Sequence, residues 1–311
     1  MSDGEHQKGD SDAGKRFGFV ALVGATNAGK STLLNQLVGQ KVSITSRKVQ
    51  TTRMPIRGIR TEGRSQIVFV DTPGIFKPRR RLDKAMVSAA WGGAADADIV
   101  LLLLDAAKPV DVDTTAMVER LGLLPIPKVL VLNKVDRIRK ESLLQLSADL
   151  NAHAKFEATF MVSALKGSGV ADLAQHLESA VPPGQWHFPA DEVTDLPSRI
   201  LAQEITRERI YDRLHDELPY AIAVETTAFT DMGRKKGVRV EQTILVERDS
   251  QRAIVLGQGG RTIKEISTEA RTQMSELFGR PIHLFLHVAV QEGWANDPAR
   301  YSDIGLEFPK D

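Results

Sequence analysis

The sequence predicts an α/β doubly wound domain followed by a smaller α+β domain, in a chain of 311 residues. In the first half, strand-like runs are apolar at nearly every position, and helix-like stretches separate them. Such strands indicate a parallel sheet that helices cover on both faces. After residue 182 the strands alternate apolar with polar positions, which indicates a second domain with a half-exposed sheet.

Each element of the first domain is placed by its local pattern. Buried strands are predicted at Phe17–Val23, Ile67–Val70, Ile99–Leu104, Val129–Leu132 and Thr159–Val162. Helical spacing of apolar residues predicts helices at Lys30–Val38, Leu82–Ala95, Thr114–Leu121, Ser142–His153 and Val170–Ala180. This domain is expected to span residues 16–182, after a polar tail at residues 1–15 that we expect to be disordered.

The second domain, expected at residues 198–311, follows a Pro-containing stretch that predicts a linker at residues 183–197. Its predicted order is helix, strand, strand, helix, helix, strand. The elements are expected at Arg199–Leu218, Ala221–Ala228, Val238–Glu247, two helices around a Gly-rich turn that end at Leu277, and Ile282–Val290. Beside that turn, Arg252–Leu256 is strand-like and Arg261–Glu276 is helical.

The composition limits the chemistry that the chain can carry. It has no cysteine, which excludes disulfides, Cys-ligated zinc and thiol catalysis. A net charge of +1 indicates neither a nucleic-acid nor a membrane partner. Residues 186–311 are net acidic, so any RNA contact there would need a local basic patch. No apolar run approaches the roughly 20 residues that span a bilayer, and the N-terminus lacks the apolar stretch of a secretory signal. We therefore expect a cytoplasmic protein.

The segment GATNAGKS, from Gly24 to Ser31, matches the phosphate-binding pattern GxxxxGK[ST] between a strand and a helix. Its glycines let successive backbone N–H groups face phosphate oxygens, and the helix N-terminus adds a favourable dipole. Lys30 would reach the β- and γ-phosphates, and the Ser31 hydroxyl would bind Mg²⁺. The segment predicts a P-loop NTPase domain.

Two further motifs predict a guanine nucleotide site. Asp71 begins DTPG after a strand and would hold Mg²⁺, while the Gly74 N–H would meet the γ-phosphate. The carboxylate of Asp136, in NKVD, would accept hydrogen bonds from N1–H and from the exocyclic amino group of guanine. Adenine has an acceptor at the same edge, which the carboxylate would repel. Ser163–Leu165 is assigned to guanine O6 only by its position after the last strand. The residues expected to bind the nucleotide are Gly24, Ala25, Thr26, Asn27, Ala28, Gly29, Lys30, Ser31, Thr32, Asp71, Thr72, Pro73, Gly74, Ile75, Asn133, Lys134, Val135, Asp136, Ser163, Ala164 and Leu165.

Hydrolysis needs a sensor of the γ-phosphate and a group that organises the reaction. Of the adjacent Thr51 and Thr52 we favour Thr52 as a Mg²⁺ ligand beside Ser31 and Asp71, and an exposed Thr pair is the alternative. Ile75 occupies the place where small GTPases of the Ras kind have a water-orienting Gln. Asn27 is therefore a candidate K⁺ ligand, with a loop-capping amide as the alternative. The expected catalytic residues are Thr52, Gly74, Lys30 and Asn27.

The second domain contains the loop Gly257–Gly260, GQGG, near the basic residues Arg252, Arg261 and Lys264. A GxxG loop can clamp about four nucleotides of single-stranded RNA, and a structural turn is the alternative. The expected RNA-binding residues are Arg252, Gly257, Gln258, Gly259, Gly260, Arg261 and Lys264.

Over roughly residues 16–308, these motifs resemble the Era family of bacterial ribosome-assembly GTPases. The resemblance rests on VGATNAGKSTLLN at 23–35, SITSRKVQTTR at 43–53, DTPGIFKPRRRLDKAM at 71–86, NKVD at 133–136 and IVLGQGGRTIKEI at 254–266. It implies a P-loop GTPase domain, a type II KH domain, GTP or GDP and Mg²⁺ as cofactors, and a hydrophobic residue in place of the catalytic Gln. It also implies GTP-controlled binding to 16S rRNA near its 3′ end during 30S subunit maturation, with peripheral contact at the inner membrane. We expect a monomer.

The sequence departs from the family at Gln258 and in its long polar N-terminal tail, to which we assign no role, and two alternative functions are considered. Gln258 stands where many relatives have Lys or Asn, which removes a phosphate contact from the loop. A related GTPase with a hydrophobic residue in place of the Gln, acting in tRNA modification or large-subunit assembly, would share the TTR and DTPG features but would not end in this GxxG-bearing unit. A metabolic P-loop kinase would have no need of NKVD.

Overall fold

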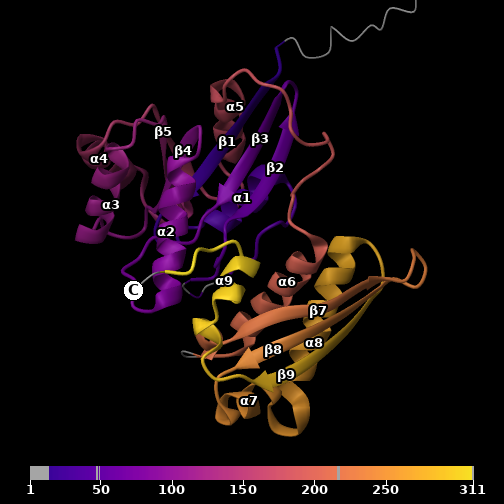
Figure 1. The fold of residues 1–311 in the computed structure, drawn as a ribbon. Coiled ribbons are helices and arrows are strands. Elements are labelled where there is room, and N and C mark those ends of the chain that lie inside the picture. The colour runs from indigo at the N-terminus through magenta and orange to yellow at the C-terminus, as the bar shows by residue number, and fades with distance from the viewer. Residues whose placement is uncertain (1–13, 47, 49, 216–217, 310–311) are drawn as a thin grey trace, which may run out of the picture.

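The computed structural model describes residues 14–46, 48, 50–215 and 218–309, which form two domains joined by an extended segment (Figure 1). The predicted tail lies outside the described residues except for its last two positions. The first domain is α/β and the smaller second domain is α+β, as the sequence predicts. The second domain lies beneath the first in the view of Figure 1.

The first domain contains a six-stranded sheet in the order β2-β3-β1-β4-β5-β6. Its strands are β1 (Arg16–Val23), β2 (Ile56–Glu62), β3 (Ser65–Asp71), β4 (Ile99–Asp105), β5 (Lys128–Asn133) and β6 (Ala158–Val162). Five run parallel, and β2 pairs antiparallel with β3 at the edge. The sequence analysis missed β2 because Arg57, Gly58 and Arg60 interrupt its apolar pattern, which an edge strand tolerates.

Helices cover both faces of this sheet. One face packs against α1 (Lys30–Val38) and α5 (Val170–Ala180), and the other packs against α2 (Arg81–Ala95), α3 (Val112–Gly122) and α4 (Lys140–His153). The short helix η1 (Val135–Arg137) follows β5. Because the strands are parallel, the loops after β1, β3, β5 and β6 meet at one edge, where ligands of such sheets bind. Across the described parts of the chain, no helix is long and apolar enough to cross a membrane.

The predicted linker, residues 183–197, has no helix or strand but packs along the edge of the first sheet. Val193 O accepts a hydrogen bond from the backbone N–H of Ile59 at 2.8 Å. Gln66 Oε1 accepts one from the backbone N–H of His187 at 3.0 Å. The segment is therefore held against the first domain and is not a free spacer.

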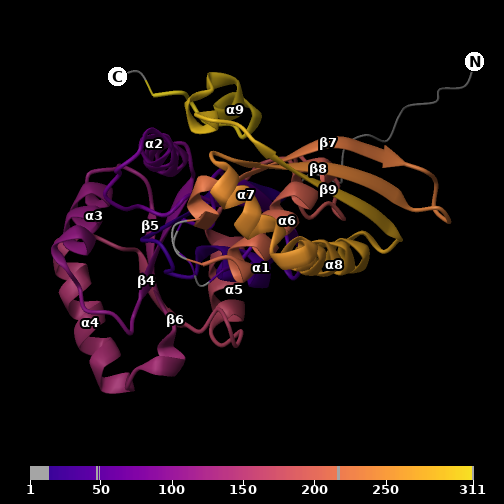
Figure 2. The same ribbon diagram turned by 90° about the horizontal axis from the view of Figure 1, so that it is seen from below.

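The second domain packs helices on one face of a three-stranded sheet with the order β7-β8-β9 (Figure 2). Its elements are α6 (Ser198–Arg213), η2 (Leu218–Ala221), β7 (Ala223–Asp231), β8 (Val238–Val246), α7 (Asp249–Leu256), η3 (Gln258–Gly260), α8 (Arg261–Phe278) and β9 (Ile282–Val290). β7 and β8 are antiparallel, whereas β8 and β9 are parallel. Apart from the short η helices, the order is the predicted one.

The prediction of a strand-like segment at Arg252–Leu256 is wrong, because these residues form the end of α7. A run of a few apolar residues fits a buried helix as well as a buried strand. Here Gln251 Oε1 accepts the backbone N–H groups of Glu247 and Arg248 at 2.8 and 3.2 Å. These bonds fix the turn from β8 into the helix, so α7 begins directly after the strand.

After β9 the chain returns to the first domain through a segment that the sequence analysis did not predict. It contains η4 (Trp294–Asn296) and α9 (Pro298–Asp303). Asp297 caps α9, and Pro298 occupies its first turn, where a missing N–H costs nothing. Tyr301 and Leu306 pack against Met86 of α2. The C-terminal segment therefore connects the two domains through an apolar contact.

Candidate functional site

The loop between β1 and α1 has a backbone that side chains would prevent. Gly24 has a φ of 155° and Gly29 a φ of 102°. A Cβ at Gly24 would lie 2.2 Å from Leu103 O, and a Cβ at Gly29 would lie 2.2 Å from Asn133 Nδ2. Glycine is therefore required at both positions of this P-loop.

Lys30, the first residue of α1, is buried beneath the P-loop. Its Nζ donates hydrogen bonds to Gly24 O and Ala25 O, both at 3.0 Å. Burial lowers the pKa of Lys30 to about 8, and the charge of Asp71 partly opposes this effect. A poorly hydrated ammonium group at this position favours an anionic ligand strongly.

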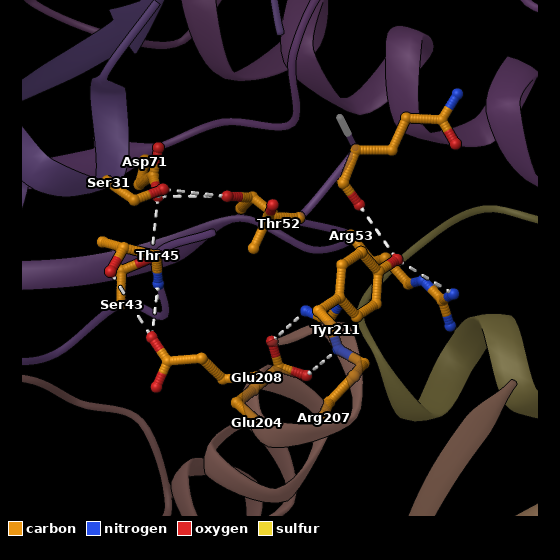
Figure 3. A network of polar contacts seen from close by, with 12 residues as sticks. Ser31, Ser43, Thr45, Thr52, Arg53, Asp71, Glu204, Arg207, Glu208 and Tyr211 are labelled. Atoms are coloured by element: carbon orange, nitrogen blue, oxygen red, sulfur yellow. Dashed lines mark hydrogen bonds and ion pairs between the residues drawn. The ribbon is translucent and has the colours of Figure 1, made fainter. Parts of the chain in front are cut away.

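Three hydroxyl groups surround one carboxylate oxygen at the end of β3 (Figure 3). Asp71 Oδ2 accepts hydrogen bonds from Ser31 Oγ at 2.6 Å, Ser43 Oγ at 2.8 Å and Thr52 Oγ1 at 3.4 Å. The other oxygen, Oδ1, is buried without a hydrogen-bond partner. Burial raises the pKa of Asp71, while Lys30 and the hydroxyl groups lower it.

This donor set fits Mg²⁺. The ion prefers hard oxygen ligands and usually takes one or two carboxylates together with water and phosphate oxygens. The cluster supplies one carboxylate with an unpaired buried oxygen, and hydroxyl groups from Ser31 and Thr52 that lie 3.0 Å apart. Ser43 was missed by the sequence analysis, although it lies in the same polar segment as Thr52.

The structure separates the two adjacent threonines. Thr52 is buried and its hydroxyl lies among the predicted Mg²⁺ ligands. The hydroxyl of Thr51 instead donates to Lys48 O at 2.9 Å. Gln50, just before them, has a φ of 56°, in the left-handed region. The chain therefore turns just before the two threonines, whose hydroxyl groups have different partners.

The predicted guanine-reading residues lie together after β5 and β6. Asn133 Nδ2 donates to Ala28 O at 2.8 Å, and Asn133 Oδ1 accepts the backbone N–H of Ala164 at 2.9 Å. This one amide therefore joins three loops that are distant in sequence. Asp136 Oδ1 accepts a hydrogen bond from Ser163 Oγ at 2.7 Å, and that bond holds the pKa of Asp136 below its usual value.

Lys134 crosses from this cluster to the P-loop. Its φ is 65°, and its Nζ donates to Asn27 O and to Asp105 Oδ2, both at 2.7 Å. Val135, in η1, is half-buried, while Leu165 remains exposed next to the cluster. The stem of Lys134 therefore lies along the side of the site where a base would be read.

Most of the remaining predicted residues lie around the P-loop. One cavity is lined by Thr26, Asn27, Gly29, Lys30, Ser31, Thr32, Thr52 and Gly74, together with Ile44, Thr45, Ser46, Gln50 and Thr51. Thr72 and Pro73 are buried beside it, and the hydroxyl of Thr72 donates to Leu22 O at 2.7 Å. Ile75 donates its backbone N–H to Gly24 O at 3.0 Å and packs its side chain against the apolar core.

The polar segment after α1 also contacts the second domain, which the sequence analysis did not foresee. Glu208 of α6 accepts a hydrogen bond from the backbone N–H of Thr45 at 2.8 Å (Figure 3). It also accepts one from Lys41 Nζ at 2.6 Å. Burial acts to raise the pKa of Glu208, but Lys41 and these hydrogen bonds hold it below its usual value. Glu208 is therefore a buried, ionised contact between the domains.

Arg53 makes a second contact between the domains. Its guanidinium is buried and donates to Ile222 O at 2.7 Å and to Pro219 O at 3.2 Å. It also donates to the hydroxyl of Tyr211 at 3.3 Å. With Tyr220 O at 3.3 Å, four acceptors on the second domain thus hold the residue that directly follows Thr52.

The GxxG loop stands at the surface between α7 and α8. Gly257, Gly259 and Gly260 have φ values of 71°, 60° and 79°, which favour glycine. Gln258 and Gly259 are exposed. Arg252 and Lys264 are exposed nearby, and Arg261 pairs with Glu265 at 3.2 Å. The predicted RNA-binding residues therefore surround one exposed turn.

Fold and site together define a P-loop GTPase domain followed by a KH domain. The family described as "50S ribosome-binding GTPase" matches residues 19–134, and the family described as "KH domain" matches residues 217–295. GTPase Era of Rhizobium meliloti (strain 1021) is 56% identical over 311 residues, covering 100% of this chain and 99% of that protein. GTPase Era of Bradyrhizobium sp. (strain BTAi1) is 57% identical over 297 residues, covering 95% and 96%.

A crystal structure of Era in complex with MgGDPNP and nucleotides 1506–1542 of 16S ribosomal RNA has the same architecture. It superposes with a TM-score of 0.88 at 34% identity, covering 94% of this chain and 99% of that chain. The chain belongs to the Era family and is a GTPase.

Proposed function

We propose that this GTPase is a GTP-controlled switch that binds the 3′ region of 16S rRNA and assists maturation of the 30S subunit. The similar Era structure holds MgGDPNP and nucleotides 1506–1542 of that RNA, which supports GTP or GDP, Mg²⁺ and 16S rRNA as ligands here. We also propose that the protein is cytoplasmic and monomeric. Peripheral contact with the inner membrane, which the family resemblance implies, belongs to the same proposal.

In this proposal the P-loop and the hydroxyl cluster hold the triphosphate. The N–H groups between Gly24 and Ser31 bind phosphate oxygens, and Lys30 neutralises the β- and γ-phosphates. Ser31, Thr52 and Asp71 would hold Mg²⁺, which supplies positive charge to the phosphates when it is bound. Thr52 lies in the segment that in GTPases acts as a switch. It would therefore bind Mg²⁺ only when the γ-phosphate is present.

Guanine selectivity is assigned to Asp136 and the residues that orient it. The Ser163 hydroxyl occupies one lone pair of Asp136 Oδ1, so the carboxylate has a fixed direction and stays ionised. Guanine offers two hydrogen-bond donors to such a carboxylate. Adenine offers an acceptor at the same place, so with adenine bound the carboxylate would have no hydrogen-bond partner on the base. The Ala164 region would contribute backbone N–H groups to O6.

Hydrolysis must proceed without a side chain that orients water after Gly74. Ile75 packs against the core and has no polar atom beyond its backbone. Asn27, in the cavity with Lys30 and Thr26, is the proposed ligand of a K⁺ ion that stabilises charge near the leaving phosphate.

The exposed GxxG loop carries the RNA part of the proposal. Gly259 has a φ of 60°, and a Cβ there would meet nothing within 4 Å. The backbone can therefore approach a phosphodiester strand closely at this position, as KH domains do. Nearby Arg252 and Lys264 supply positive charge in a domain that is otherwise net acidic.

The test is Gly259→Asp compared with Gly259→Asn, assayed with an oligonucleotide of the 16S 3′ end. Asp and Asn both tolerate a left-handed backbone and there is space for either, so both variants should fold. We expect the Asp variant to lose RNA affinity by at least about tenfold because it adds a charge that repels phosphate, and the Asn variant to lose much less. Equal RNA binding by wild type and Gly259→Asp, with GTP affinity unchanged, would contradict the proposal.

A further inference from the structure

Ser43 contacts the proposed Mg²⁺ site without belonging to its proposed ligands. Of the hydroxyl groups around Asp71 Oδ2, those of Ser31 and Thr52 belong to proposed ligands and that of Ser43 does not. Ser43 Oγ donates to this oxygen at 2.8 Å (Figure 3). Both residues are buried, so water does not compete for the bond, and the low local dielectric strengthens it. The Ser43 hydroxyl can therefore fix the direction of the carboxylate.

The backbone of Ser43 is held by one side chain of α1. Asn35 Oδ1 accepts the backbone N–H groups of Val42 and Ser43 at 2.9 and 3.0 Å. Asn35 Nδ2 donates to Ser43 O at 2.8 Å. Val42 is also buried in the apolar core of the first domain, together with Leu34 and Leu37 of α1. The position of Ser43 is therefore set by α1 and by the core of its own domain.

The same helix carries a proposed Mg²⁺ ligand. Ser31 lies four residues before Asn35, so the two side chains lie on one face of α1, one turn apart. Ser31 Oγ contacts Asp71 directly at 2.6 Å, and Asn35 acts on Asp71 through Ser43. The helix α1 therefore holds the carboxylate through two separate hydroxyl groups.

Thr52 is held in a different way. Its hydroxyl lies 3.4 Å from Asp71 Oδ2, the longest of the three distances. The next residue, Arg53, donates to carbonyl groups of the second domain. Thr52 is also the residue whose binding to Mg²⁺ is proposed to require the γ-phosphate. The contact between Ser43 and Asp71 does not depend on Thr52, so it can persist in the GDP state.

We infer that Ser43, held by Asn35, is a positioning residue that directs the carboxylate of Asp71 in both the GDP and the GTP state. The inference rests on the proposed Mg²⁺ site and extends it. Hydrogen bonds that orient a metal-binding side chain typically change metal affinity about 10–100-fold. Loss of the Ser43 hydroxyl should therefore weaken Mg²⁺ binding with either nucleotide, whereas loss of the Thr52 hydroxyl should weaken it only with GTP.

The experiment measures Mg²⁺ affinity without relying on hydrolysis. The full chain is loaded with a fluorescent derivative of GDP or of a non-hydrolysable GTP analogue, and the rate of nucleotide release is followed at increasing free Mg²⁺. Ser43→Ala should raise the midpoint of the Mg²⁺ dependence at least about tenfold with both nucleotides. Thr52→Ala should raise it with the GTP analogue and not with GDP.

Release rates in EDTA separate a positioning role from a structural one. Without the metal, Ser43→Ala should release both nucleotides at the wild-type rates, because the P-loop is unchanged. A general distortion of the site would instead speed release in EDTA as well. Faster release of equal size with and without Mg²⁺ would overturn the inference.

A second variant, Asn35→Ala, tests how Ser43 is held. It should reproduce the effect of Ser43→Ala, and the double variant should lose no more than Ser43→Ala alone, because both changes remove the same contact. Independent effects of about tenfold each would multiply to about a hundredfold, and that result would overturn the role of Asn35.

The matched control is Ser179→Ala, which removes one exposed hydroxyl of α5 that donates to His176 O at 2.7 Å. Both of its Mg²⁺ midpoints should be those of wild type. Asp71→Asn removes the carboxylate charge and should weaken Mg²⁺ more than Ser43→Ala does. An unchanged midpoint in Asp71→Asn would overturn the proposed Mg²⁺ site first. A changed midpoint in Asp71→Asn with a wild-type midpoint in Ser43→Ala would overturn this inference alone.

Discussion

Glu208 accepts the backbone N–H of Thr45 at 2.8 Å across the boundary between the two domains. Thr45 lies two residues from Ser43, whose hydroxyl donates to Asp71 at 2.8 Å. A short polar path therefore leads from the proposed Mg²⁺ ligands to α6 of the KH domain. A contact in a segment that is proposed to respond to the nucleotide can transmit that response only if its energy differs between the nucleotide states.

We predict that Glu208→Gln weakens the coupling between GTP and RNA. The variant keeps an acceptor for Thr45 but loses the ion pair with Lys41, which Glu208 makes from a buried position. Couplings between sites typically change affinity about 5–150-fold, and the variant should reduce the effect of a GTP analogue on RNA affinity about fivefold. RNA dissociation constants measured with GDP and with a non-hydrolysable GTP analogue give this ratio.

Glu241→Gln is the matched control for this coupling. Glu241 lies on β8 and pairs with Arg239 of the same strand at 2.7 Å. Its substitution should leave the ratio at the wild-type value. A wild-type ratio in Glu208→Gln as well would show that the domains communicate by another route.

The second prediction concerns pH and the P-loop lysine. Burial lowers the pKa of Lys30 to about 8, so part of the ligand-free protein has a neutral Lys30 above that pH. Phosphate binding favours the charged form and raises the pKa, so GTP binding takes up a proton there. Affinity should therefore fall as pH rises from about 8 to about 9, by up to about tenfold per unit.

Isothermal titration calorimetry in buffers of different ionisation enthalpy measures this proton uptake. Lys30→Arg keeps its charge over the whole range, so its weaker binding should not show the same fall. If wild type takes up no proton above pH 8, then Lys30 is fully charged before the nucleotide binds.

The third prediction tests the guanine assignment. Asp136→Asn replaces one acceptor by an amide donor, while the amide oxygen can still accept from Ser163 Oγ. Guanine affinity should fall by about a hundredfold or more, and xanthine, with a carbonyl at C2, should become the better base. Asp149→Asn, at an exposed position of α4, should change neither affinity. Unchanged guanine affinity in Asp136→Asn would remove Asp136 from the site.

Local motifs made it possible to predict from the sequence most of the residues that the structure brings together at the proposed nucleotide site. Gly24–Ser31 and Asn133–Asp136 are contiguous, and each follows a strand that its own apolar run defines. Parallel topology then brings the ends of β1, β3 and β5 together, so the meeting of Lys30, Asp71 and Asp136 at one edge follows from the fold class.

The contacts between the domains were not predictable in the same way. Glu208 is 163 residues from Thr45, and nothing local distinguishes it from any other helical glutamate. The strand β2 was hidden by its arginines, and the short apolar run at the end of α7 was interpreted as strand-like although a helix was expected before the Gly-rich turn. By contrast, α9 has a visible signal, because Asp297 followed by Pro298 is a typical helix start.

The last prediction concerns Asn27 and monovalent cations. Ile75 offers no polar group to organise hydrolysis, and Asn27 lies in the P-loop with a φ of 61°. Asn27→Gly keeps this left-handed backbone without strain and removes the whole side-chain amide, including the oxygen that would bind K⁺. Replacing Na⁺ by K⁺ should raise the turnover of wild type at least about tenfold, equivalent to about 1.4 kcal/mol of transition-state stabilisation. The Gly variant should lose this response while binding GTP nearly as well as wild type. Single-turnover GTP hydrolysis in matched NaCl and KCl measures the effect, and equal rates in both salts for wild type would exclude Asn27 as a K⁺ ligand.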